Sequence, residues 1–296
     1  MADIPAADAH PGVTVRSDLV YATERGVELH LDLYLPATRP APLCLWLHGG
    51  GWVRGSRTAR AAERLVPMAR NGMAVAAVQY RFSGEAPFPA QLDDVRAAVR
   101  WLRRNAADLA LDAERIGAWG ASAGGHLAAL LALCPDERDR DLGDSSVQAA
   151  VCWYPITDLT RRETDVPEGP LPSFATGPPM VPPPEARLLG VESLRQAAAA
   201  AAASPITHVH PGAPPFLLMH GDRDGWVPSE QSRALHRALQ VDGVPTSLLL
   251  LAGANHEDPA FETPSSLAAV AAFLRSALLP EPHRPGDAAE AGSTAG

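Results

Sequence analysis

The chain has 296 residues, of which 46% are hydrophobic and 20% are charged. This composition is typical of a globular protein and excludes a fully disordered chain or a fibre. The formal net charge of −9 argues against nucleic acid as a partner and against binding to anionic membranes. All 25 basic residues are arginine, which excludes a lysine Schiff base and a lysine-type phosphate loop.

The two ends of the chain predict little regular structure. Residues 1–18 are polar and contain proline, so we expect a loose arm, and residues 281–296 are expected to be a disordered tail. No secretory leader is visible, and no apolar run approaches the roughly 20 residues that span a bilayer. Cys44, Cys134 and Cys152 lie in apolar stretches, as buried thiols of a reducing compartment do. We therefore expect a cytoplasmic protein with no membrane insertion, folded over residues 19–280.

Short apolar runs alternate with segments of helical period along residues 19–280. Residues 27–34 alternate in polarity, as a half-buried antiparallel strand does. Six further runs suit strands buried on both faces of a parallel sheet: 43–47, 74–78, 116–119, 149–153, 216–219 and 247–251. Helices are expected at 58–70, 91–105, 122–133, 229–240 and 265–278. This order predicts an α/β fold in which helices cover both faces of a mostly parallel sheet.

One insertion interrupts this order at about residues 160–205. Its first part, residues 163–185, is dense in proline, which argues against regular helix or strand. Its second part, residues 196–203, contains seven consecutive alanines and favours a helix. Long irregular segments in compact domains are often lids or binding loops, and a tolerated surface insertion is the alternative.

The strongest motif in the chain is Gly120-Ala121-Ser122-Ala123-Gly124. An expected strand precedes it and an expected helix follows it, which is the setting of a nucleophile elbow. Such a tight turn needs small flanking residues and presents the serine at the carboxyl end of a strand, in front of a helix N-terminus. A Gly-rich turn with a capping serine is the alternative. We expect Ser122 to be a nucleophile.

A serine hydroxyl is a weak nucleophile that needs a general base, and the base needs an orienting acid. His256 lies in a polar loop directly after the strand expected at 247–251, and Asp224 follows the strand expected at 216–219. The chain order Ser122, Asp224, His256 is the order expected of an α/β-hydrolase. Asp222 lies on the same loop as Asp224, and spacing alone does not separate the two aspartates.

Acyl transfer through a tetrahedral intermediate also needs hydrogen-bond donors for the oxyanion. The segment His48-Gly49-Gly50-Gly51-Trp52 follows the strand expected at 43–47. Its three glycines let the backbone approach a substrate closely and direct N–H groups at it. The N–H of Ala123, directly after the serine, would be a further donor. A phosphate-binding loop is the alternative, but the segment has no lysine and no helix-start pattern after it.

These stretches together resemble the α/β-hydrolase superfamily, in the lipase and esterase branch that is similar to hormone-sensitive lipase. Within it the chain looks most like bacterial feruloyl- and acetyl-esterase-like enzymes. The resemblance rests on residues 31–36 (LDLYLP), 48–52 (HGGGW), 80–81 (YR), 88–94 (FPAQLDD), 120–128 (GASAGGHLA), 203–207 (ASPIT), 220–228 (HGDRDGWVP) and 253–256 (GANH). It implies a central sheet of about eight strands with a lid-like insertion, and a serine carboxylesterase acting on small acyl esters without metal or organic cofactor.

The resemblance also assigns site residues. It implies that Asp224, and not Asp222, is the acid of the triad, and that Gly50, Gly51 and Ala123 form the oxyanion hole. A homodimer through the last helix is implied by the resemblance alone. One departure is local: residue 255 is asparagine where the family usually has glycine before the histidine.

Several residues have weaker assignments. Four aromatic residues follow expected strands at their carboxyl ends, and this shared location favours a substrate pocket over ordinary packing: Trp52, Trp153, Tyr154 and Trp226. His48 and His126 are expected to brace loops. His208 and His210 have the spacing of a metal pair, but no third ligand clusters with them, so a surface loop is favoured and no metal site is expected. Arg81 could pair with an aspartate at 93 or 94.

Three other functions fit the same motifs. The chain could be an amide or formamide hydrolase similar to kynurenine formamidases, or a tailoring esterase or lyase of secondary metabolism. A binding protein similar to hormone receptors of this fold is disfavoured, because such receptors lose the triad histidine, and this chain has His256.

Overall fold

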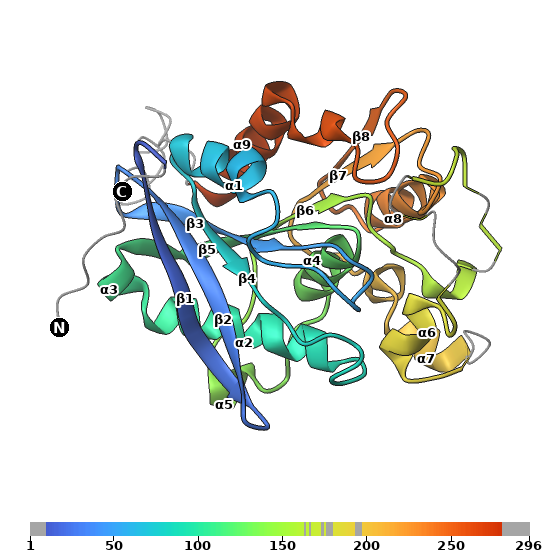
Figure 1. Cartoon of the computed structure of the whole chain (residues 1–296), viewed down its shortest axis with the longest axis horizontal. Coiled ribbons are helices and arrows are strands. Elements are labelled where there is room, and N and C mark those ends of the chain that lie inside the picture. The colour runs from blue at the N-terminus through green and yellow to red at the C-terminus, as the bar shows by residue number, and fades with distance from the viewer. Residues whose placement is uncertain are drawn as a thin grey trace, which may run out of the picture.

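The structure, a computed structural model, describes residues 10–279 except 163, 166, 173–174, 176–179 and 193–196. In this part of the chain an eight-stranded sheet has the order β1-β2-β4-β3-β5-β6-β7-β8 (Figure 1). β1 (Val13–Glu24) pairs antiparallel with β2 (Val27–Pro36), and β2 pairs antiparallel with β4 (Ala74–Val78). All further neighbours are parallel: β3 (Ala41–Leu47), β5 (Leu111–Ala121), β6 (Ala149–Trp153), β7 (Phe216–Gly221) and β8 (Thr246–Leu251). The predicted mostly parallel sheet is confirmed.

Helices cover both faces of the sheet, as expected (Figure 1). α1 (Ala61–Arg70) and α9 (Pro264–Leu278) pack on one face. On the other face lie α2 (Ala90–Arg104), α4 (Ala123–Leu133) and α8 (Glu230–Val241). The short helices α3 (Ala106–Leu109) and α5 (Asp139–Leu142) follow α2 and α4 along the chain.

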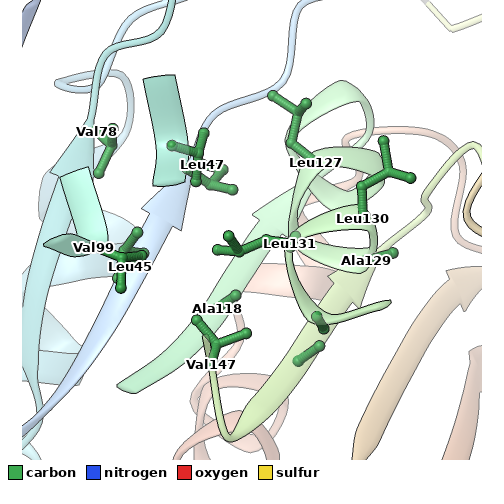
Figure 2. Close-up of a cluster of buried hydrophobic side chains, with 14 of the residues drawn as sticks. Leu45, Leu47, Val78, Val99, Ala118, Leu127, Ala129, Leu130, Leu131 and Val147 are labelled. Atoms are coloured by element: carbon green, nitrogen blue, oxygen red, sulfur yellow. The ribbon is translucent and has the colours of Figure 1, made fainter. Parts of the chain in front are cut away.

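Two hydrophobic layers hold these helices to the sheet, because successive side chains of a strand point to opposite faces. Leu45 and Leu47 belong to the layer under α4, and Trp46 belongs to the layer under α1 and α9. Figure 2 shows Leu45 and Leu47 near Leu127 and Leu131 of α4. Every residue of α4 is buried, so the helix behind Ser122 is held by the core on all sides.

The edge strand β1 differs from the expected loose arm. It begins at Val13, so the expectation is wrong for residues 13–18, whereas residues 1–9 lie outside the described part of the chain. Most of β1 is exposed, and its pairing with β2 has two register shifts. A strand that buries little has no continuous apolar run for a sequence pattern to detect. The expected tail at 281–296 also lies outside the described residues.

The described residues of the insertion form two short helices, with 3₁₀ turns at its borders. α6 (Pro184–Leu189) begins inside the segment expected to hold no helix, with proline in its first turn, where a missing N–H removes no helical hydrogen bond. That expectation is therefore wrong at 184–185. α7 (Ala197–Ala202) is the helix that the alanines predicted. η1 (Leu159–Arg161) and η3 (Pro205–His208) lie at the borders of the insertion, and η4 (Pro259–Glu262) lies after β8.

The three cysteines are free thiols, Cys44 and Cys152 buried and Cys134 half-buried. Burial raises the pKa of the Cys134 thiol to about 11 and raises those of the other two further. Among the helices of the described residues, none has the length and apolar character needed to cross a membrane.

Candidate active site

Ser122 stands on a sharp turn between β5 and α4. Its φ of 54° and ψ of −117° lie in a region that L-residues rarely adopt. The Ser122 N–H donates to the carbonyl of Trp153 at 2.9 Å. A Cβ atom at Gly120 would lie 2.1 Å from the Gly124 carbonyl oxygen, and one at Gly124 would lie 2.0 Å from that of Leu47. The turn therefore requires glycine on both sides of the serine, as a nucleophile elbow does.

A hydrogen-bonded line joins the three residues expected to form a triad. The Ser122 hydroxyl is 2.9 Å from His256 Nε2, and His256 Nδ1 is 2.7 Å from Asp224 Oδ2. Because β5, β7 and β8 are parallel, the residues that follow their carboxyl ends meet at one edge of the sheet. A carboxylate can only accept, so Nδ1 carries the proton and Nε2 is the free base facing the serine.

Asp224 is a fully buried carboxylate with every oxygen bonded. Its Oδ1 accepts the N–H groups of Trp226 and Val227, both at 2.8 Å, and its Oδ2 also faces His220 Nε2 at 3.3 Å. Burial by itself would raise the pKa of Asp224, but hydrogen bonds from His220 and His256 outweigh burial and hold the pKa well below its ordinary value. The acid therefore stays ionised throughout the neutral range.

The competing aspartate has a different partner. Asp222 Oδ1 accepts the N–H of Gly253 at 2.7 Å, and Asp224 is the aspartate bonded to His256. His220, for which no role is predicted above, braces the acid loop: Nε2 donates to the Val227 carbonyl at 2.9 Å, and Nδ1 accepts from Ser232 at 2.7 Å. The only sequence feature that pointed to this role is the position of His220 at the start of the 220–228 motif.

The glycine loop after β3 lies against the serine turn. Gly50 and Gly51 have φ values of 120° and 62°, and a Cβ atom at Gly50 would lie 2.1 Å from the Arg54 carbonyl oxygen. The Gly50 carbonyl accepts the N–H groups of Val53 and Arg54 at 3.2 Å. In the described part of the chain, the N–H groups of Gly50, Gly51 and Ala123 bond to no acceptor.

An exposed carboxylate borders the same loop. The space that a Cβ atom at Gly49 would fill lies 3.2 Å from Glu257 Oε1 and 3.4 Å from the Ser122 Cβ. Glu257 directly follows His256 and has a left-handed φ of 57°, which carries its side chain toward the glycine loop. The site therefore has an exposed carboxylate beside its glycine loop.

His48 and His126 brace loops, as expected. His48 Nδ1 donates to the Gly49 carbonyl at 2.8 Å, and Tyr80 donates its hydroxyl to the His48 carbonyl at 2.8 Å. His126 Nε2 donates to the Ala203 carbonyl at 2.7 Å, which ties α4 to the insertion. Burial lowers the pKa of each histidine to about 4, so both are neutral at pH 7.

The four aromatic residues expected to line a pocket do not share one place. The Tyr154 ring lies 4.5 Å from the His256 ring, and Trp226 is half-buried on the acid loop. Trp153 packs against Trp119 at 4.9 Å within the core, and Trp52 and Tyr154 are 1% and 0% exposed. The pocket assignment is wrong for Trp153, whose ring lies in the hydrophobic layer under α1 and α9, because the direction of a side chain at a strand end depends on the register of the sheet. For Trp52, Tyr154 and Trp226 the assignment stays a prediction.

The remaining candidates have structural partners. Arg81 forms a close ion pair with Asp94, with Nη2 2.6 Å from Oδ1. His208 donates Nε2 to the Ala202 carbonyl at 2.8 Å. Over the described ranges no group of three or more histidine, cysteine, aspartate or glutamate side chains could hold a metal ion.

The sheet order, the strained serine after β5 and its partners after β7 and β8 are those of the α/β-hydrolase fold, in its serine-nucleophile form. The BD-FAE family model matches residues 31–239, and the chain belongs to this family.

Two mycobacterial relatives are similar over much of the chain. Esterase LipQ of Mycobacterium tuberculosis is 34% identical over 274 residues, which cover 90% of this chain and 60% of LipQ. The probable carboxylic ester hydrolase LipM of the same organism is 32% identical over 233 residues, covering 76% of this chain and 50% of LipM. The chain thus spans about half to three fifths of these curated relatives.

Two solved structures match over nearly their whole length. A truncated carbohydrate esterase from gut microbiota has a TM-score of 0.76 and 28% identity, covering 92% of this chain and 98% of its own. The thermophilic esterase Est2 of the planctomycete Thermogutta terrifontis has a TM-score of 0.69 and 30% identity, covering 92% and 95%.

Proposed function

We propose that this chain is a serine carboxylesterase that hydrolyses small acyl esters. The observation that carries the proposal is the buried, hydrogen-bonded line from the Ser122 hydroxyl through His256 to Asp224. In each half-reaction His256 Nε2 removes a proton from the attacking oxygen and returns it to the departing one, and Asp224 stabilises the charged imidazole in between.

The first half-reaction forms an acyl-enzyme. Ser122 Oγ attacks the ester carbonyl as its proton passes to His256, and the N–H groups of Gly50, Gly51 and Ala123 bind the oxyanion. The tetrahedral intermediate then expels the alcohol, which takes the proton from His256. In the second half-reaction water attacks the acyl-enzyme by the same route and releases the acid. No step requires a metal or an organic cofactor.

The relatives support this reaction and the size of the acyl group. Curated relatives are named esterase and carboxylic ester hydrolase, and Est2 has been solved with propionate and with butyrate bound. The same esterase has been solved phosphorylated by paraoxon. Trp226, half-buried beside Asp224, is the aromatic residue that we expect to contact the substrate. A cytoplasmic location stays a prediction.

A substrate series tests the proposal. Wild-type protein should hydrolyse p-nitrophenyl acetate and butyrate with a higher kcat/KM than p-nitrophenyl octanoate, and should turn over N-formylkynurenine poorly. Ser122→Ala should abolish turnover, while Ser276→Ala, an exposed serine of α9, should retain it. Preferential cleavage of N-formylkynurenine would instead favour a formamide hydrolase, and full activity in Ser122→Ala would overturn the proposal.

A further inference from the structure

Asn255 lies between β8 and His256, and its side-chain amide bonds in three directions. Its Oδ1 accepts the N–H of His256 at 2.7 Å and the N–H of Gly225 at 2.9 Å. Its Nδ2 donates to the carbonyl of Pro170 at 2.9 Å. One side chain thus holds three backbone segments.

Each partner belongs to a different part of the site. His256 is the base, and Gly225 directly follows the acid, between Asp224 and the Trp226 N–H that bonds the Asp224 carboxylate. Pro170 belongs to the proline-rich segment of the insertion. The amide therefore links the base loop, the acid loop and the insertion.

The backbones are too close at this point for another side chain to enter. A Cβ atom at Gly225 would lie 1.9 Å from the Pro170 carbonyl oxygen, and one at Gly169 would lie 1.8 Å from the Arg223 carbonyl oxygen. The insertion and the acid loop are thus in backbone contact, and the Pro170 carbonyl that Asn255 binds is a fixed anchor.

A second contact holds the same end of the insertion. Glu168 accepts from both the N–H and the hydroxyl of Ser229, with its Oε1 2.6 Å from the hydroxyl oxygen. Ser229 directly precedes α8, and a carboxylate at this N-terminus is favoured by the helix dipole. The Glu168 N–H also donates to the Asp224 carbonyl at 3.3 Å.

We propose that Asn255 is a positioning residue that sets the distance between the acid and the base by tying both of their loops to the insertion. This inference rests on the proposed function for its kinetic consequence. The amide is required because two N–H groups need an acceptor and the Pro170 carbonyl needs a donor, a combination that an amide offers and that aspartate and alanine do not.

The proposal predicts a selective effect on kcat. Among the described residues the Asn255 side chain bonds only to backbone atoms, so its loss leaves KM for a small ester within about twofold. A displacement of the base by about 1 Å costs up to about 100-fold in rate, so Asn255→Gly should lower kcat by tenfold to 100-fold. Asn255→Asp keeps the acceptor and loses the donor to Pro170, and should fall between Asn255→Gly and the wild type.

A matched control separates positioning from loss of stability. Asn105 also bonds through its amide, donating Nδ2 to the Trp101 carbonyl at 2.8 Å, and it lies at the far end of α2. Asn105→Gly removes a side-chain hydrogen bond and adds backbone freedom, as Asn255→Gly does, but should leave kcat unchanged. Each kcat is divided by the fraction of protein that paraoxon phosphorylates when the labelling reaction is complete, because this fraction measures the concentration of competent active sites.

A second readout does not depend on any substrate. Hydrogen–deuterium exchange should become faster in peptides covering 222–230 and 253–258 in Asn255→Gly, and should stay at wild-type rates there in Asn105→Gly. Unchanged exchange in those peptides, or a corrected kcat of Asn255→Gly equal to that of the wild type, would overturn the inference. Wild-type protein without ester turnover would contradict the proposed function, while the exchange measurement would still decide the role of Asn255.

Discussion

Replacing Gly124 by alanine tests the close approach on which the serine turn depends. Gly124 is the second residue of α4, and a Cβ atom there would lie 2.0 Å from the Leu47 carbonyl oxygen and 2.6 Å from that of His48. Both neighbours are backbone atoms at the start of the glycine loop and cannot rotate away. The N-terminus of α4, directly after Ser122, must therefore move from that loop by more than about 1 Å to restore an ordinary contact.

The displacement separates the nucleophile from two of its expected oxyanion donors. A shift of about 1 Å at a reacting group costs about 100-fold in rate, so kcat/KM for p-nitrophenyl acetate should fall by about that factor. Overpacking costs about 1–3 kcal/mol of unfolding free energy, which for a chain of this size lowers Tm by about 5 °C at the upper end. Alanine gains about 1 kcal/mol of helix propensity over glycine, which acts in the opposite direction.

The matched control is Gly84→Ala, because a Cβ atom at Gly84 would have no heavy atom within 4 Å. It should leave kcat/KM unchanged and Tm unchanged or slightly raised. Thermal unfolding and ester hydrolysis are measured on the same preparations. If Gly124→Ala kept wild-type kcat/KM with an equal or higher Tm, helix propensity alone would account for the effect of the substitution. The predicted steric clash with the Leu47 and His48 carbonyls would then be refuted.

Three further predictions concern charge and protonation. Asp224→Asn should lower kcat by about 10⁴-fold, because an amide does not stabilise the protonated histidine as a carboxylate does; steady-state kinetics with circular dichroism as a folding control checks it, and a loss under tenfold would contradict it. Burial lowers the pKa values of His48 and His126 to about 4, so between pH 6.5 and pH 4 the unfolded chain binds more protons than the folded one. The unfolding free energy should therefore fall with falling pH by about 1 kcal/mol per pH unit for each histidine. Urea unfolding measured at several pH values should show that the unfolding free energy of His126→Gln depends less steeply on pH than that of the wild type. Glu257→Gln should raise kcat/KM for an ester with a carboxylate on its acyl chain relative to an uncharged ester of equal length, and should do so less at high salt; an equal effect on both esters would rule out a role of this charge.

The parts of the fold that bury continuous apolar runs could be predicted from the sequence. Residues 74–78 and 149–153 are strands with the expected bounds, because only a strand covered on both faces needs such runs. β1 could not be predicted, because an edge strand exposed on much of its length has no such pattern. The start of α6 at Pro184 was missed because proline, which breaks a helix interior, is favoured in a first turn.

The serine and histidine of the triad could be predicted from the motif and the chain order. The residues that support the triad could not be predicted in this way. The choice of Asp224 over Asp222 needed the resemblance, and the structure gives the physical difference: one aspartate bonds to His256 and the other to Gly253. Asn255 joins residues 30 and 85 positions away, and no local pattern records such a meeting. Trp153 was misassigned because the face toward which a strand-end ring points is set by sheet register.

The central claim is that Ser122 is the nucleophile activated by His256, and covalent labelling tests it most directly. Paraoxon transfers a diethyl phosphoryl group to an activated serine and releases p-nitrophenolate. Intact-mass analysis of wild-type protein should show one phosphoryl group per chain, located at Ser122 by peptide mapping. Ser122→Ala should remain unlabelled, His256→Ala should be labelled far more slowly, and Ser276→Ala should match the wild type. Labelling of Ser122→Ala at the wild-type rate, or a phosphoryl group on any other residue, would contradict the claim.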